Sequence, residues 1–244
     1  MNKNNNYIEY KNILEYNDYE LNELLYEKAL IIDKRTYIQY YLSLLRTNHV
    51  LIFSFYCNNK DYNSQIIKSF LFFFFLVLHL TINALFFNDD TLHKIYLDEG
   101  KFNFIYQIPQ IIYSSLISAV LSVIIKYLSL SEKNIIEIKN EKDIDSLKEK
   151  VEKLFNKLKI KFILFFILTF LLLLFFMYYI SCFCCIYENT QFHLIKDSII
   201  SFALSLIYPF GIYLFPGIFR IPALRAEKKD KQYLYKISLF IQSL

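Results

Sequence analysis

FILFFILTFLLLLFFMYYISCFCCIY (162–187) is an unbroken run of apolar and weakly polar residues without a single charged side chain. An α-helix rises 1.5 Å per residue, so about 20 such residues cross a hydrocarbon core of roughly 30 Å. Lipid offers no hydrogen-bond partners to the backbone, and a single segment satisfies its own backbone groups only as a helix. The run therefore predicts a transmembrane helix.

Three further apolar runs have the same character, at 66–87, 108–128 and 198–219. The chain has 244 residues, of which 55% are hydrophobic and 20% charged, and the two classes are separated into blocks. A soluble domain would instead spread its apolar residues at helix or strand periods. We therefore predict an all-α membrane protein with four transmembrane helices, occupying residues 66–220.

Lysine and arginine predict which side each connection faces. The N-terminal segment through Lys68 and the segments 89–103, 126–161, 188–197 and 220–244 carry 8, 2, 10, 1 and 6 of these residues. Cytoplasmic segments of membrane proteins are enriched in both. Both termini and the loop 129–161 are therefore predicted to be cytoplasmic. The net charge of +4 suggests lipid headgroups as the partner, and no nucleic acid.

The N-terminal part is expected to lie at the cytoplasmic surface. Residues 1–18 are predicted to be a disordered tail and 19–65 to form surface helices, with Asp33 capping one of them. HVLIFSFYC (49–57) is too short to span, so we interpret it as an interfacial helix on the cytoplasmic leaflet. Residues 221–244 are expected to form a cytoplasmic C-terminal segment.

The loop 129–161 contains a short heptad pattern. Apolar residues recur at 3-4-3-4 spacing, at Ile144, Leu147, Val151, Leu154 and Leu158. Two heptads fall short of the three or four that identify a coiled coil. The alternatives are a helix that packs on its own protein or continues into the third span, and a weak dimerising coiled coil.

Polar residues inside the first two spans form the candidate site. The first span carries His79 and Asn83, and the second carries Gln110, Ser114, Ser118 and Ser122 on one helical face. This face could line a water-filled path. It could equally be a seam at which small residues let two helices approach, with His79 bonded to a serine of the second span. The third span looks lipid-facing nearly all round.

YPFGIYLFPGIFRIPALR (208–225) contains three of the four prolines and two of the three glycines. Proline removes an intrahelical hydrogen bond and clashes with a carbonyl one turn back. We therefore predict helix breaks at Pro209, Gly211, Pro216 and Gly217. Broken spans build midplane sites in many transporters, and they also occur as simple kinks. Arg220 and Arg225 are expected to meet lipid headgroups.

Signals of catalysis or metal binding are weak. The outer loops contain Asp89, Asp90, His93, Asp98 and Glu99, then Glu188, His193 and Asp197. Such acidic loops are what the charge rule predicts for an outer face. The pair His93 and Asp98 matches an acyltransferase H-x4-D motif, but the loop has no room for that catalytic domain. We expect no enzyme activity, no cofactor and no metal, and interpret CFCC (182–185) as small packed residues.

A family resemblance rests on four segments of the chain. They are ELNELLYEKALIIDKRTYIQYYLSLLR (20–46), TINALFFNDDTLHKIY (81–96), FNFIYQIPQIIYSSLIS (102–118) and the proline-containing segment 208–225. They resemble uncharacterised multi-pass membrane proteins of AT-rich single-celled eukaryotes, over about residues 20–225. The resemblance implies a eukaryotic integral membrane protein and brings no catalytic residue or ligand.

Two functions fit these features. One is a structural or interaction protein whose partners are the bilayer, other membrane helices or a second copy of the chain. The other is a channel or transporter subunit that uses the polar face of the second span and the broken fourth span. Neither the substrate nor the organelle can be read from the sequence.

Overall fold

The computed structural model describes residues 16–58, 60–87, 89–97, 104–139, 144–188, 190–225 and 231–243. Within these ranges every regular element is a helix and there is no strand. The all-α class with four helices able to span a membrane is confirmed. The four stretches that are long and apolar enough to cross a bilayer are Gln65–Leu85, Ile108–Ser129, Glu149–Ile186 and Gln191–Arg225.

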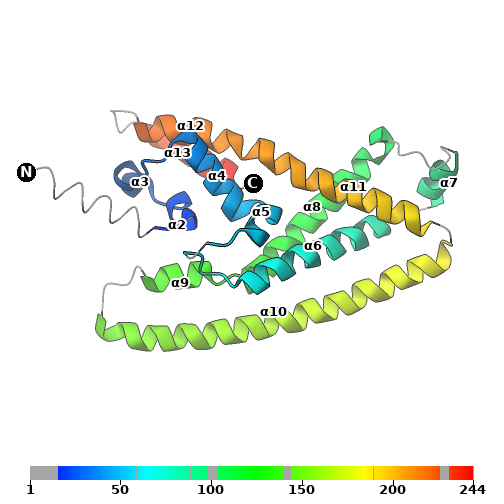
Figure 1. Ribbon diagram of the computed structural model, residues 1–244, viewed down its shortest axis with the longest axis horizontal. Helices are drawn as coiled ribbons and strands as arrows, with labels where there is room; N and C mark the ends of the chain where they lie inside the picture. Colours follow the sequence, from blue (N-terminus) through cyan, green and yellow to red (C-terminus); the bar gives the residue numbers. More distant parts are fainter. Residues whose placement is uncertain are drawn as a thin grey trace, which may run out of the picture. The chain divides into compact units, whose positions relative to one another are not determined.

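Figure 1 labels the helices in chain order. Those that contain the spans are α6 (Gln65–Leu85), α8 (Phe104–Ser129), α10 (Ile144–Ile186), α11 (Gln191–Ile212) and α12 (Leu214–Arg225). The others are α2 (Asp18–Asn22), α3 (Tyr26–Ile32), α4 (Tyr37–Asn48), α5 (Val50–Phe55), α7 (Asp89–Leu97), α9 (Glu132–Lys139) and α13 (Gln232–Ser243). They form two compact units, the span unit (62–205) and the clasp unit (1–61 with 206–244).

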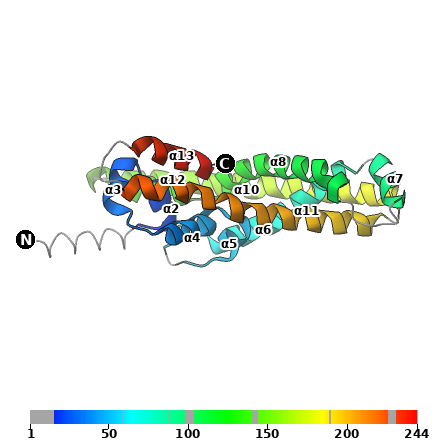
Figure 2. The ribbon, with the colours of Figure 1, turned by 90° about the horizontal axis from the view of Figure 1, so that it is seen from above.

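In the span unit, α6 is the central helix and packs against both α8 and α10 (Figures 1 and 2). Its apolar side chains are buried over most of its length. Phenylalanine rings of α6 and α10 meet edge to face or tilted, with Phe70 5.8 Å from Phe165 and Phe74 6.0 Å from Phe176. Such aromatic pairs stabilise the contact beyond the area they bury.

These contacts correct the expectation that the third span faces lipid nearly all round. Phe165, Phe176 and Phe183 are all buried, at spacings of eleven and seven residues. Both spacings return to nearly the same side of an α-helix. One stripe of α10 therefore packs on protein, while Phe166, Phe170 and other large residues on the remaining faces are exposed.

Helix α10 joins the heptad segment of the loop 129–161 to the third span without interruption. Its 43 residues rise about 65 Å, roughly twice the thickness of the hydrocarbon core. The alternative that the heptad helix continues directly into the third span is confirmed. Helix α9 packs on α10, while Val151 and Phe155 remain 47% and 68% exposed. The coiled coil stays a prediction.

The clasp unit joins both ends of the chain. Leu21, Leu24, Tyr26 and Ala29 of the N-terminal helices form one buried cluster with Ala223 and Tyr235 of α12 and α13. A second cluster brings Tyr40 and Leu44 of α4 against Ile221 of α12. Two hydrophobic clusters therefore hold the two ends of the chain together, with Tyr26 and Ala223 of the first cluster 197 residues apart in sequence.

Capping residues fix where the N-terminal helices begin. Asn17 caps α2 and Thr36 caps α4, each in a capping box with the side chain three residues later. The expectation that Asp33 caps α4 is wrong: Asp33 lies at the C-terminal end of α3 and is committed to arginine partners. Residues 17 and 18 belong to this capped helix, whereas residues 1–15 of the expected tail lie outside the described residues.

The segment expected to lie at the interface forms the short helix α5. His49 caps it, and Phe53 is buried while Leu51 and Phe55 are exposed. One side of α5 thus packs within the clasp unit and the other carries apolar side chains outward. Its position at the membrane surface stays a prediction.

The fourth span is interrupted at Tyr213, between α11 and α12. Pro209 lies in the last turn of α11 and Pro216 in the first turn of α12. A proline is tolerated in a first turn because its missing N–H would have no intrahelical partner there. Helix α12 then continues through Pro222 to Arg225.

Candidate functional site

Two groups of polar residues are candidate functional sites, one in each unit. In the span unit, the side chain of His79 is buried at 2% exposure. Its Nε2 lies 2.9 Å from the hydroxyl of Ser201 on α11, and its Nδ1 lies 3.5 Å from the hydroxyl of Ser118 on α8. A neutral imidazole can donate through one nitrogen and accept through the other, so these two hydroxyls match its needs.

The sequence pointed to a serine of the second span as the partner of His79. The shorter contact is instead to Ser201 of the fourth span, and the contact to Ser118 is the longer one. His79 therefore links three helices, α6, α8 and α11. Sequence patterning could not show this, because the register between two spans is set by their packing.

The polar face of the second span is turned toward α6. Gln110 donates its amide to the backbone oxygen of Asn83 at 3.4 Å, and Ser114 is fully buried. The hydroxyl of Ser114 donates to the carbonyl of Ile111 in its own helix. Ser118 and Ser122 are half-buried. Small polar side chains on a face turned toward a neighbouring helix fit a packing seam, and the hydroxyls of Ser114 and Ser118 both lie near protein groups.

In the clasp unit, three side chains of the N-terminal segment bind the backbone of the broken fourth span. The Tyr37 hydroxyl donates to the carbonyl of Leu214 at 2.7 Å, and the Tyr41 hydroxyl donates to that of Phe210 at 3.2 Å. His49 Nε2 lies 2.8 Å from the carbonyl oxygen of Leu206. We call these three contacts the clasp.

The clasp has a regular spacing that explains how it forms. The three carbonyls lie four residues apart: Leu206 and Phe210 share one face of α11, and Leu214 is the first residue of α12. Because α11 ends at Ile212, the carbonyl of Phe210 is among the last four of the helix, which lack the usual intrahelical partner. The tyrosine hydroxyl supplies that missing hydrogen bond.

The two glycines of the break have different surroundings. A Cβ atom placed on Gly217 would lie 2.7 Å from Cε2 of Tyr37, closer than real Cβ atoms approach other groups. At Gly211 such an atom would meet nothing within 4 Å. Gly217 is therefore required for α4 to lie close against α12, whereas the packing makes no such demand at Gly211.

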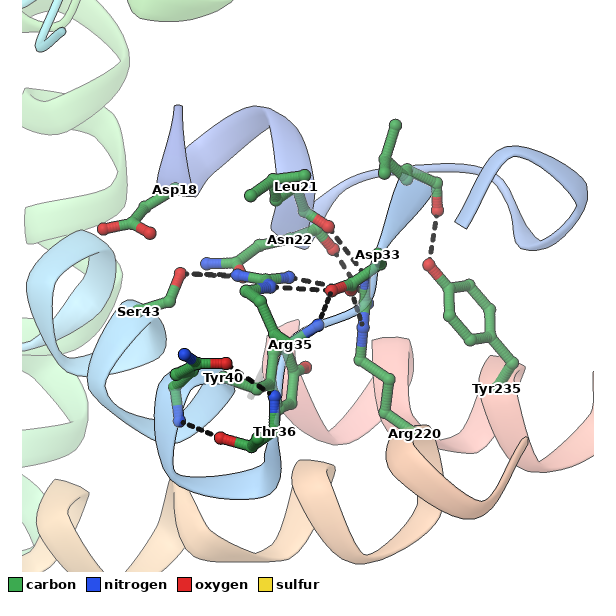
Figure 3. Close-up of polar contacts among 12 residues, drawn as sticks. Asp18, Leu21, Asn22, Asp33, Arg35, Thr36, Tyr40, Ser43, Arg220 and Tyr235 are labelled. Carbon is green, nitrogen blue, oxygen red and sulfur yellow. Dashed lines mark hydrogen bonds and ion pairs between the residues drawn. The ribbon is translucent and has the colours of Figure 1, made fainter. Parts of the chain in front are cut away.

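Arg220 is the centre of a buried ionic network in the clasp unit (Figure 3). Its side chain is completely buried. It donates through Nε and Nη2 to Oδ2 of Asp33 at 3.1 and 2.9 Å, and to the carbonyls of Asn22 and Leu21 at 3.1 and 2.6 Å. The expectation that Arg220 meets lipid headgroups is wrong, because its guanidinium is used inside the protein.

Aromatic rings complete the surroundings of this guanidinium. Its carbon lies 4.8 Å from the ring centre of Tyr40 and 4.7 Å from that of Tyr235. Cations at such distances are attracted to the ring quadrupole, more strongly when water is excluded. The Tyr235 hydroxyl donates to the Leu24 carbonyl at 2.7 Å, and burial raises the pKa of Tyr235 to about 12.

The carboxylate of Asp33 accepts hydrogen bonds from two arginines, Arg35 and Arg220. Arg35 donates through Nε to Oδ1 at 2.8 Å and through Nη2 to Oδ2 at 2.9 Å, beside the bonds from Arg220. Burial alone would raise the pKa of the Asp33 carboxyl. The hydrogen bonds and positive charges of Arg35 and Arg220 outweigh this effect and lower the pKa below its ordinary value of 3.8. Asp33 is thus a buried, ionised link between α3 and α12.

The connections that follow α6 and α10 contain few contacts between acidic, histidine and cysteine side chains among the described residues. Asp89, Asp90 and His93 are exposed on α7, and the Tyr187 hydroxyl donates to Asp89 at 3.1 Å. Among the described residues no three histidine, cysteine or acidic side chains are grouped as a metal ion would need. Asp98, Glu99 and therefore half of the H-x4-D motif lie outside the described residues. The cysteines of CFCC and Cys57 are free thiols.

No family model, curated protein or solved structure matches this chain. The resemblance to multi-pass proteins of AT-rich single-celled eukaryotes consequently remains an expectation. Four apolar helices point to a membrane-embedded protein.

Proposed function

We propose that this chain is a multi-pass membrane protein with a structural or interaction role rather than a catalytic one. The observation that carries the proposal is the clasp. The carbonyls of Leu206, Phe210 and Leu214 on the broken span accept hydrogen bonds from His49, Tyr41 and Tyr37 of the same chain, respectively. In transporters that use a broken span, such backbone groups serve the substrate or the coupling ion.

The clasp unit also supports a topology. Its core combines the N-terminal helices with α12 and α13, so both ends of the chain belong to one folded body. Two segments that pack together outside the bilayer lie on the same side of it, which requires an even number of crossings. Four spans meet that requirement, and the distribution of lysine and arginine favours the cytoplasmic side.

The bilayer is the first partner in this proposal, and another membrane helix or a second copy is the next. The part of α10 that precedes its apolar run carries Val151 and Phe155 largely exposed. Exposed apolar side chains at helical spacing favour association with a further helix. Chemical cross-linking of the full chain in its native membrane would show whether copies associate through α10.

A cysteine-accessibility scan tests the proposal against its main alternative. In a variant without native cysteines, new cysteines replace Ser114, Ser118 and Ser122 in turn, and one at the exposed Glu188 serves as a positive control. A packing seam predicts that a hydrophilic thiol reagent labels the control and leaves the three serine positions unlabelled. Labelling at these positions would refute the seam. Ser118→Leu should also lower the yield of folded protein.

The second candidate is a channel or transporter subunit, and one observation favours it. The side-chain amide nitrogen of Asn83 and the hydroxyl of Ser198 are buried without a hydrogen-bond partner among the described residues. Buried donors without partners in a membrane helix indicate a place that a polar molecule can occupy. Reactive cysteines along the second span would favour this function over the first.

A further inference from the structure

Among the described residues of the span unit, two buried side chains have a polar atom that the packing leaves unsatisfied. Asn83 is 1% exposed and Ser198 is 4% exposed. The Nδ2 atom of Asn83 and the Oγ atom of Ser198 have no hydrogen-bond partner within the described part of the chain. Such a group costs free energy comparable to a lost hydrogen bond, so native proteins rarely retain one without an unseen partner.

The helix register places these two groups at one level. Asn83 follows His79 by one turn on α6, and Ser198 precedes Ser201 by about one turn on α11. His79 and Ser201 are themselves in contact at 2.9 Å. The two helices run in opposite directions (Figures 1 and 2). The steps from His79 to Asn83 and from Ser201 to Ser198 therefore lead toward the same end of the unit.

Helix α8 forms the third wall. Gln110 lies within hydrogen-bond distance of the Asn83 backbone oxygen, which fixes α8 beside this level. The buried Ser114 lies one turn further along α8, toward the contact between Ser118 and His79. Polar side chains from three helices thus surround one place, next to the pair formed by His79 and Ser201.

This place lies toward the end of the span unit at which α6 ends and α11 begins. Asn83 is two residues before the end of α6 at Leu85. Ser198 is the first residue of the fourth apolar run, and Gln110 is the third residue of the second run. All three positions lie within about one turn of the polar end of their helix segment, where a bilayer gives way to headgroups and water.

We propose that Asn83, Ser198 and Gln110 bind water, forming a hydrated vestibule above the His79–Ser201 pair. A water molecule accepts from the Asn83 amide and exchanges a hydrogen bond with the Ser198 hydroxyl, which supplies the two or more polar partners that buried water needs. The vestibule brings water to within one helical turn of His79. This inference goes beyond the proposed function and does not depend on it.

A double-variant comparison on the full chain in detergent tests the vestibule. The variants are Asn83→Leu, Ser198→Ala and the two combined, and the measurement is the thermal midpoint followed by circular dichroism. A shared water predicts that each single change lowers the midpoint by about 2–4 °C, because the water loses a partner. The combined variant should fall no further than the larger single effect, because both changes disrupt the same water.

A dry site predicts the opposite sign. Each substitution would then remove an unsatisfied buried group, so the midpoints would rise and the two effects would add. Ser114→Ala is the matched control, since its hydroxyl already bonds to Ile111 within the helix; its effect should add to that of Ser198→Ala. Should Asn83→Leu fail to fold, Ser198→Ala decides alone: an unchanged or raised midpoint overturns the proposal.

Discussion

Replacing Asp33 by asparagine should strongly destabilise the clasp unit. The substitution keeps the shape of the side chain and removes its charge. Asp33 is the carboxylate that Arg35 and Arg220 share, and the side chains of Asp33 and Arg220 are 1% and 0% exposed. In the Asp33→Asn variant two guanidinium groups would remain beside a neutral amide whose NH₂ group is itself a donor.

The size of the effect follows from burial. Removing one member of a buried ion pair costs about 3–5 kcal/mol, because the remaining charge has lost its counter-charge and cannot regain water. For a chain of this length 1 kcal/mol corresponds to a thermal midpoint shift of about 2–4 °C. The midpoint of Asp33→Asn should therefore fall by roughly 6–20 °C.

The assay is thermal unfolding in detergent, followed by circular dichroism, with Arg225→Gln as the matched control. Arg225 lies on the same helix as Arg220 and is exposed, so its substitution should change stability by less than about 0.5 kcal/mol. A cycle with Arg220→Met should show strong coupling to Asp33→Asn, since both remove the same ion pair. If Asp33→Asn behaves like the control, the buried network does not hold the clasp unit together.

Three further predictions concern the same unit. Gly217→Ala should destabilise the clasp unit by about 1–3 kcal/mol because the new methyl group meets the ring of Tyr37. The methyl group of Gly211→Ala has no atom within 4 Å, so this variant should be neutral or slightly stabilising in the same unfolding assay. Stability should decline as the pH falls below about 4: the pKa of Asp33 is lower in the folded chain than its ordinary 3.8, so its contribution is complete above that value and is lost below it. At the alkaline end, the raised pKa of Tyr235 makes stability fall between pH 10 and about 12, and this fall should be smaller in Tyr235→Phe when the variants are titrated side by side.

The spans could be predicted because each depends on local properties alone. A run such as 162–187 must form a helix in lipid regardless of the remaining chain, and the heptad pattern before it has the same period, so α10 continues through both. The prolines and glycines within a few residues of Tyr213 likewise predicted the interruption of the fourth span there.

The clasp unit could not be predicted because its contacts join distant segments. Arg220 and Asp33 are 187 residues apart, and the charge rule treats every arginine near a span as a headgroup contact. In the stretch DKRT both Asp33 and Thr36 are good helix caps. Asp33 is paired with Arg35 and Arg220, and Thr36 is the residue that caps α4. The hint in the sequence was the position of Arg220, directly after the fourth apolar run and before the further apolar residues 221–224.

The same limit applies to the intramembrane polar residues. Spacing put Ser114, Ser118 and Ser122 on one face but could not say which neighbour that face meets. His79 was expected to bond to a serine of the second span, whereas its shorter contact is to Ser201 of the fourth span. A short apolar stretch containing several serines offers no pattern that singles out one of them.

The topology is the central claim, and glycosylation mapping tests it most directly. Acceptor tags are placed at the N-terminus, at the C-terminus and in the connection after α10 near Glu188, and each tagged chain is synthesised with microsomes. Four crossings with both ends in the clasp unit predict that only the tag near Glu188 is glycosylated. Glycosylation of one terminus but not the other would mean an odd number of crossings and would contradict the account.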